Sequence, residues 1–169
     1  MTVKGLEKVL EEKNKNGITL TNQEILALID ENVYISTDVK EHYNTKGKLH
    51  CEDGPSVVFT NGDKQWFKNG KLHRENGPAV ERANGDKHWY VNGKLHREDG
   101  PAIEWANGVK NWYQDNKLHR AYAPAIEHPN GTKYWYKNGK RHREDGPAIE
   151  LSDGTQEWWL DGKKQKRAS

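Results

Sequence analysis

The chain has 169 residues, a formal net charge of +2 and only 33% apolar residues, and its mean hydropathy is −1.15. So polar a composition is typical of chains that bury little surface. Seven tryptophans and seven tyrosines nevertheless supply apolar area, because each large ring buries roughly 150–250 Å². The single cysteine, Cys51, excludes an internal disulfide and a cysteine-based zinc site. No apolar run is long enough to span a membrane, and the first residues do not resemble a signal peptide. We therefore expect a cytoplasmic protein.

Residues 1–42 differ from the remainder of the chain and are predicted to form a helical cap. Apolar residues at helical spacing around residues 6–10 favour a first helix. Thr21, followed three residues later by Glu24, forms a capping box that predicts the start of a second helix. Residues 33–35 fit either a short strand or an extended connector. The helices are interpreted as a cover for the first edge of a repeat array, and the alternative is a helix pair that binds a partner.

From residue 43 onward the sequence repeats with a period of 23 residues, which is the mark of a repeat architecture. Three residue types keep this period: Trp66, Trp89, Trp112, Trp135 and Trp158; Pro55, Pro78, Pro101, Pro124 and Pro147; His50, His73, His96, His119 and His142. A leading fragment at 43–49 precedes the full units, which are 50–72, 73–95, 96–118, 119–141 and 142–164. A basic tail, 165–169, follows them. The predicted domains are therefore the cap at 1–42 and the array at 43–164.

Each unit reads as a β-hairpin with an additional extended segment. Thirteen of the sixteen glycines follow Asn or Asp inside the units, and Asn-Gly or Asp-Gly between strand-like segments is the strongest short hairpin signal. Residues 87–91 and 94–97 are thus predicted to be the strands of a hairpin closed by Asn92-Gly93. Pro101 ends the second strand, because proline cannot donate to a ladder. Residues 102–105 are extended again, and Asn107-Gly108 turns into the next unit.

Residues 89–96, which read Trp-Tyr-Val-Asn-Gly-Lys-Leu-His, together with Gly100 and Gly108, resemble the MORN repeat. The resemblance covers about three quarters of the chain. It departs from the usual pattern after the histidine, where Arg97 and its equivalents stand in place of glycine. The His-Arg-Glu-Asp-Gly-Pro-Ala variant resembles repeats in uncharacterised bacteriophage, bacterial and large-virus proteins. The resemblance implies an elongated, twisted antiparallel sheet of stacked hairpins, and roles as a scaffold or as a binder of proteins or membrane lipid.

The recurring residues are interpreted as structural. The tryptophan column is expected to be core, as is a second, aliphatic column: Val57, Val80, Ile103, Ile126 and Ile149. One hairpin per unit would place equivalent histidines roughly 10 Å apart, twice the inter-strand spacing. Zinc ligands must instead converge to about 2.1 Å from the metal. A ladder of His, Arg and Glu contacts is therefore preferred to a metal site, and no metal, cofactor or catalytic residue is predicted.

Enzymatic activity and nucleic-acid binding are both weakly indicated. Paired acids such as Glu98-Asp99 recur in the repeat, and they cannot all form an active site. Aromatic residues interleaved with Arg and Lys suit a nucleotide or nucleic-acid binder. However, the 27 basic residues are nearly balanced by 25 acidic ones, so the electrostatic footprint of such a binder is weak.

The places where the repeat is broken indicate where a partner binds, because a regular array presents the same surface many times. Asp115-Asn116 replaces Asn-Gly, and Ala121-Tyr122-Ala123 replaces Glu-Asp-Gly. The position after the extended Ile-Glu segment also varies, through Phe59, Arg82, Trp105, His128 and Leu151. Drift between repeats is the alternative explanation for this variation. The predicted partner-binding residues are Trp105, Asp115, Asn116, Ala121, Tyr122, Ala123, Phe59 and His128.

The sequence therefore predicts a mainly β, non-enzymatic repeat protein that binds a protein partner. One specific form of this hypothesis is a phage-encoded inhibitor of a host or defence protein, acting in the host cytoplasm. The alternatives are a nucleotide or nucleic-acid binder, a lipid-associated scaffold and a structural component of a virion. The oligomeric state does not follow from the sequence.

Overall fold

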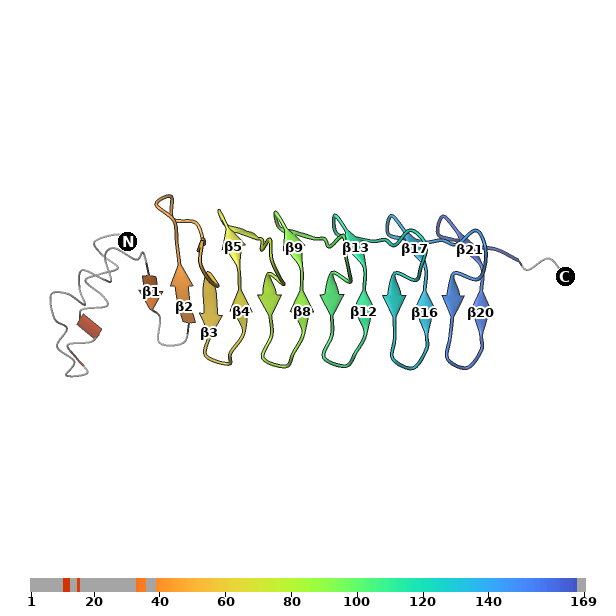
Figure 1. Cartoon of the computed structure of the whole chain (residues 1–169), viewed down its shortest axis with the longest axis horizontal. Helices are drawn as coiled ribbons and strands as arrows, with labels where there is room; N and C mark the ends of the chain where they lie inside the picture. Colours follow the sequence, from red (N-terminus) through yellow and green to blue (C-terminus); the bar gives the residue numbers. More distant parts are fainter. Residues whose placement is uncertain (1–10, 13–14, 16–32, 36–38, 167–169) are drawn as a thin grey trace. The chain divides into compact units, whose positions relative to one another are not determined.

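The structure is a computed structural model that describes residues 11–12, 15, 33–35 and 39–166 (Figure 1). It divides into two compact units, Met1–Lys71 and Leu72–Ser169. The described residues confirm the predicted mainly β fold of repeated antiparallel hairpins. Most of the predicted helical cap at 1–42 lies outside them. No helix among the described residues is long and apolar enough to cross a membrane.

In the first unit, four strands form an antiparallel sheet in the order β1 (Val33–Ile35), β2 (Val39–His42), β3 (Val57–Phe59) and β4 (Lys64–Gln65). Of the two alternatives for residues 33–35, the structure has the strand. It also has a strand at β2, which pairs with β3 and thereby extends the sheet to before residue 43. The short strands β5 (Phe67–Lys68) and β6 (Lys71–Leu72) follow.

The second unit is built on a long antiparallel sheet of four hairpins. The hairpins are β7–β8 (Val80–Glu81, Lys87–His88), β11–β12 (Ile103–Glu104, Lys110–Asn111), β15–β16 (Ile126–Glu127, Lys133–Tyr134) and β19–β20 (Ile149–Glu150, Gln156–Glu157). Neighbouring hairpins pair through β8 with β11, β12 with β15 and β16 with β19. Each repeat therefore adds two strands to the sheet.

A second row of hairpins, each a separate two-stranded sheet, lies along one end of the long-sheet strands (Figure 1). These short hairpins are β9–β10 (Tyr90–Val91, Lys94–Leu95), β13–β14 (Tyr113–Gln114, Lys117–Leu118), β17–β18 (Tyr136–Lys137, Lys140–Arg141) and β21–β22 (Trp159–Leu160, Lys163–Lys164). Each repeat thus contributes two hairpins rather than the one predicted. The predicted strand at 87–91 was wrong as one element, since the structure divides it at Trp89 into β8 and β9.

The tryptophan backbone makes the corner between the two rows. The N–H of Trp89 donates to the carbonyl of Ala102 in the long sheet at 2.8 Å, while its own carbonyl accepts from the N–H of His96 at 3.2 Å. Trp112 and Trp135 make the same pair of bonds. A residue whose N–H serves one sheet and whose carbonyl serves another cannot lie inside a continuous strand, which explains why the predicted element splits.

The most deeply buried column consists of alanines, which the sequence analysis did not single out. Their exposed fraction is 0% at Ala79, Ala102, Ala125 and Ala148. The expected aliphatic column is buried at Val57, Val80, Ile103 and Ile149, whereas Ile126 is half-buried. The expectation that the tryptophans form the enclosed core is corrected, because all five are only half-buried. A ring at the corner between two rows of hairpins has sheet on one side and is open on another.

Candidate functional site

The structure places the predicted partner-binding residues in separate regions. Trp105 and His128 begin the turns of the β11–β12 and β15–β16 hairpins. Residues 121–123 precede β15, so they lie at the opposite end of that strand from His128. Trp105 lies at the same end as His128, because β12 and β15 pair in register, with Lys110 opposite Glu127. The structure therefore does not bring Trp105 and Tyr122 together, as a single site built on both would require. Phe59 ends β3 in the first unit, where it is half-buried.

Trp105 and His128 both pack against side chains of the long sheet. The Trp105 ring meets His88 edge-on, with 5.3 Å between ring centroids, and His128 meets Tyr134 in the same way at 5.9 Å. Trp105 is 37% exposed. Burial lowers the pKa of His88 below its ordinary value, so its imidazole is held in the neutral form. These rings serve the packing of the turns, and Trp105 keeps one exposed surface.

Asp115 and Asn116 form the tip of the β13–β14 hairpin and make contacts that account for the loss of glycine there. Both adopt positive φ, 48° and 65°, which asparagine and aspartate tolerate better than other side chains. The N–H of Asn116 donates to the Leu95 carbonyl at 3.0 Å, and its side-chain Oδ1 accepts from the Leu95 N–H at 2.7 Å. The Asp115 carboxylate lies 3.4 Å from Lys94 Nζ. Gly93 and Gly139 make the same backbone bond to their preceding units, so the structural role of this break is the additional side-chain bond of Asn116.

Ala121, Tyr122 and Ala123 form the loop between β14 and β15, and Tyr122 is fully exposed. Ala121 and Tyr122 line a groove of about 520 Å³, which we call the Tyr122 groove. Its other lining residues are His119, Arg120, Trp135, Tyr136, Lys137, His142, Arg143, Glu144 and Asp145. An equivalent groove of about 550 Å³ lies between the regular loops that contain Glu75 and Glu98. The two grooves occupy corresponding positions in the repeat, so they can be compared residue by residue.

In the two units that read His-Arg-Glu-Asp-Gly, the arginine after the histidine makes three side-chain contacts. Arg97 donates from Nε to the Asp99 carboxylate at 3.0 Å and from Nη1 to Glu104 at 3.1 Å. Its guanidinium carbon also lies 4.1 Å from the centre of the Trp89 ring, a cation–π stack. The hydrogen bond from Arg97 holds the pKa of Asp99 below its usual range. Arg143 repeats all three contacts, with Asp145, Glu150 and Trp135.

Arg120 keeps two of these contacts and lacks the third. Its Nη1 donates to Glu127 at 2.7 Å, and its guanidinium lies 3.9 Å from the centre of the Trp112 ring. The position that Asp99 occupies in its own unit is taken here by Tyr122, whose hydroxyphenyl group makes no hydrogen bond within the described part of the chain. Among the described residues, no acceptor contacts Arg120 Nε. The guanidinium is thus held in place with one donor unused.

The replacement of glycine by Ala123 reinforces this difference. A Cβ atom added at Gly100 would lie 2.8 Å from Cζ of Arg97, and one added at Gly146 would lie 2.8 Å from Cζ of Arg143. Real Cβ atoms do not approach other atoms so closely. The methyl group of Ala123 therefore requires a small displacement of the loop or of the guanidinium, while Arg120 keeps its contacts with the Pro124 carbonyl, Glu127 and the Trp112 ring.

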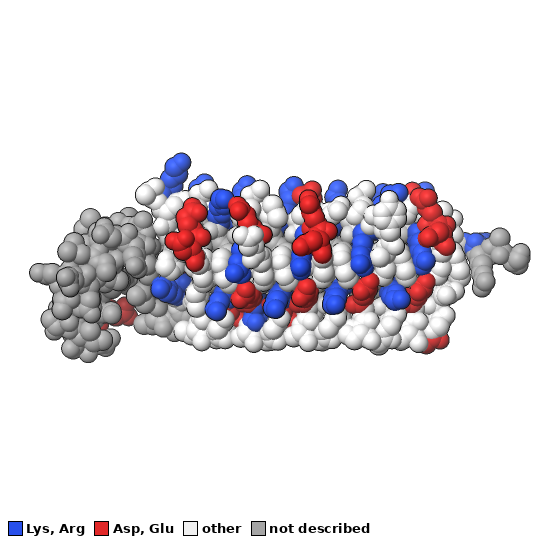
Figure 2. Space-filling view, viewed as in Figure 1, with Lys and Arg blue, Asp and Glu red and all other residues white. Residues whose placement is uncertain are grey.

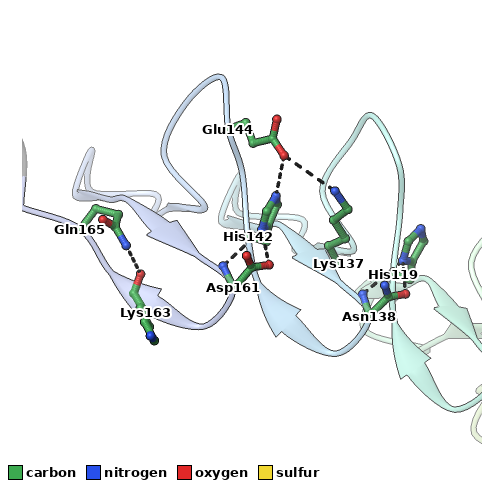
Figure 3. Close-up of polar contacts among 8 residues, drawn as sticks. All are labelled: His119, Lys137, Asn138, His142, Glu144, Asp161, Lys163 and Gln165. Carbon is green, nitrogen blue, oxygen red and sulfur yellow. Dashed lines mark hydrogen bonds and ion pairs between the residues drawn. The ribbon is translucent and has the colours of Figure 1, made fainter.

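His119 shows a parallel loss of partner (Figure 3). The N–H of Asn138 donates to Nδ1 of His119 at 3.2 Å, and because a backbone N–H can only donate, the proton of the neutral ring lies on Nε2. The equivalent His142 accepts from the N–H of Asp161 in the same way, and its Nε2 lies 3.1 Å from Glu144. In the unit of His119 the glutamate is replaced by Ala121. Within the described residues, His119 Nε2 has no partner.

The two grooves differ in charge as a result. The Tyr122 groove is lined by three cationic and two acidic side chains, and the regular groove by two cationic and three acidic ones. Both acids of the Tyr122 groove are engaged: Glu144 lies 3.7 Å from Lys137 Nζ as well as near His142, and Asp145 accepts from Arg143. Over the second unit, the row of acidic loops in Figure 2 is interrupted between β13 and β17. The substitutions at 121–123 thus create a local excess of hydrogen-bond donors.

The structure therefore adds His119, Arg120 and Trp135 to the residues that sequence reasoning had assigned to this region. All belong to columns that were interpreted as structural because they recur. The signal that could have found them is their position beside the altered loop, since a recurring donor becomes available when its recurring acceptor is lost. Among the described residues, no group of three His, Cys, Asp or Glu side chains could hold a metal ion.

Comparison with models of known protein families found no match for this chain, and comparison with curated proteins found no significant match either.

Proposed function

We propose that this chain is a non-enzymatic repeat protein, of the kind that the MORN repeat exemplifies, and that it binds a protein partner at the Tyr122 groove. The observation that carries the proposal is the fully exposed Tyr122 beside a groove in which Arg120 Nε and His119 Nε2 lack the acceptors that Arg143 and His142 have in their own unit. Tyrosine is a frequent anchor of protein interfaces because it buries a large area at low cost in rotamer entropy.

Of the two breaks in the repeat, only this one lacks a structural explanation. Asn116 replaces a turn glycine and makes a hydrogen bond to Leu95. At 121–123, by contrast, two acids and a glycine are exchanged for residues that remove contacts and add none within the described chain. A change that weakens the fold locally is expected where function requires it.

Binding of nucleotides or nucleic acids is the second candidate, and the aromatic columns favour it less than expected. One face of Trp89, Trp112 and Trp135 is covered by the guanidinium group of an arginine from the same chain. That face is not free to stack on a base. The lipid-associated scaffold, the virion component and the inhibitor of a host or defence protein are more specific hypotheses, and the inhibitor is the form of protein binding that we favour.

The experiment is capture of partners from a lysate by the purified protein and by two variants, compared by quantitative mass spectrometry. Tyr122→Ala should reduce recovery of a specific partner and weaken its affinity by about 1–2 kcal/mol. The matched control is Asn76→Ala, which alters the corresponding exposed position of a regular loop and should leave recovery unchanged. A partner that is retained equally by all variants would show that the Tyr122 groove is not the binding site.

A further inference from the structure

We infer that the Tyr122 groove receives an acidic segment of the partner, whose carboxylates accept hydrogen bonds from Arg120 Nε and His119 Nε2. This inference rests on the proposed function and names the chemistry of the partner. These carboxylates would stand in for the Glu and Asp side chains that regular units carry in their own loops at these positions.

The chain itself supplies the template for this interaction. In the unit that contains Arg143, Asp145 accepts from Arg143 Nε at 3.0 Å, and Glu144 lies 3.1 Å from Nε2 of His142. The same two donors exist in the altered unit, on the same backbone framework. Arg120 donates its backbone N–H to the Tyr136 carbonyl at 3.3 Å, just as Arg97 donates to Tyr113 at 3.4 Å. What differs is that the acceptors are missing and that Ala123 stands in place of glycine.

The donors are held in place before any ligand arrives. The Arg120 side chain is 32% exposed, and its guanidinium is held by Glu127, by the Pro124 carbonyl at 3.2 Å and by the Trp112 ring. The His119 ring is oriented by its bond from Asn138. Groups that are already ordered lose little entropy on binding, and hydrogen bonds from a guanidinium to a carboxylate are among the stronger ones.

A carboxylate on a peptide segment suits the groove better than a phosphodiester chain. Glu144 and Asp145 line the same groove, and together they would repel a ligand that carries a charge at every residue. Acidic side chains of a peptide bring negative charge only to the side of the groove where Ala121 and Tyr122 have replaced acids. The rest of a protein segment can then pack on the exposed ring of Tyr122.

The probe for the test is a short peptide, acetyl-Gly-Glu-Asp-Gly-Pro-amide, which reproduces the chain's own regular loop. Its counterpart with Gln and Asn in place of Glu and Asp is the uncharged control. Binding to the full chain is followed by NMR, through the Nε–Hε signal of Arg120. We expect a saturable shift with the acidic peptide and an affinity for the amide peptide that is weaker by at least about tenfold.

Two loop variants provide the matched tests. Replacing the altered loop by the regular one, with Ala121→Glu, Tyr122→Asp and Ala123→Gly, should abolish binding of the acidic peptide because the chain then fills its own groove. The converse exchange, Glu98→Ala, Asp99→Tyr and Gly100→Ala, should create a second binding site beside Arg97. Thermal unfolding followed by circular dichroism establishes that both variants are folded.

Equal binding of the acidic and amide peptides, or full binding by the variant with the regular loop, would overturn the inference. A shift of the Arg120 signal by inorganic phosphate or a single-stranded oligonucleotide, without one by the acidic peptide, would also overturn it. The outcome for the proposed function is separate. If capture of a partner requires Tyr122 but the acidic peptide fails to bind, only the inference of an acidic ligand is refuted. Peptide binding with no Tyr122-dependent partner refutes the proposed function alone.

Discussion

The tip of the β13–β14 hairpin offers a direct test of whether a break in the repeat serves the fold. Asn116 has a φ of 65° and accepts the Leu95 N–H at 2.7 Å. Replacement by alanine removes this hydrogen bond, which contributes about 0.5–1.5 kcal/mol. The replacement also places alanine, which tolerates the left-handed region less well than Asn or Asp, at a positive φ, and this conformation costs about 1–2 kcal/mol. We expect Asn116→Ala to lower the free energy of unfolding by roughly 1.5–3 kcal/mol.

Two matched variants separate these contributions. Gly139 occupies the equivalent turn position with a φ of 81°, and the nearest atom to an added Cβ would be 3.8 Å away. Gly139→Ala therefore carries the conformational cost of a glycine-to-alanine change alone, about 1–2 kcal/mol, and the difference between Asn116→Gly and Asn116→Ala should match it. Asn116→Gly loses the bond but relieves the backbone, so its net change should stay below about 1 kcal/mol.

The measurement is urea unfolding followed by circular dichroism, with the variants compared at equal protein concentration. If Asn116→Ala is no less stable than the wild-type chain, the hydrogen bond to Leu95 contributes nothing, and the reasoning is refuted. Asn116 would then return to the residues whose only explanation is partner binding. Because Asn116 has a structural role, Asn116→Gly should leave partner capture unchanged.

Three further predictions concern the array. Ile103 is buried, so Ile103→Ala should lower the free energy of unfolding in urea by about 2–5 kcal/mol. Val91 is exposed, so Val91→Ala should lower it by less than about 0.5 kcal/mol. Similar losses at both positions would contradict the assignment of the core. Burial lowers the pKa of His88 in the folded chain below its ordinary value of 6.5. The unfolded chain therefore binds this proton more readily than the folded chain does. The contribution of His88 to stability is complete above pH 6.5 and is lost as the pH falls through the folded-state pKa. His88→Gln should therefore flatten the change in urea midpoint between about pH 7.5 and 5.5, and an unchanged profile would exclude His88 as its source. Deletion of residues 96–118, one complete period, should leave a cooperatively folded chain, because each unit contacts mainly its neighbours; loss of the circular dichroism melt would argue against this modular construction.

Local sequence signals were sufficient for the turns and the period. Asn92 and Gly93 have the positive φ values, 51° and 83°, that the Asn-Gly pair predicts, because backbone preference at such a pair hardly depends on its surroundings. Burial of Val80 and Ile103 likewise follows from their position in extended segments that alternate in and out of a sheet. The N-terminal helices remain predictions, since they lie outside the described residues.

What the sequence could not determine is how these segments pair with one another. Alternation identifies the faces of a strand but not the sheet to which it belongs, so the division at Trp89 between the long sheet and the short hairpins was not predictable. Ala102 is fully buried because neighbouring hairpins pack together around it. Alanine is small and occurs in many environments, so the sequence gives no indication of this burial. The site was decided in the same way. Only the paired strands show that Trp105 lies at the far end from Tyr122, and only the contacts of Arg120 reveal a donor without an acceptor, because both facts depend on residues that are distant in the sequence.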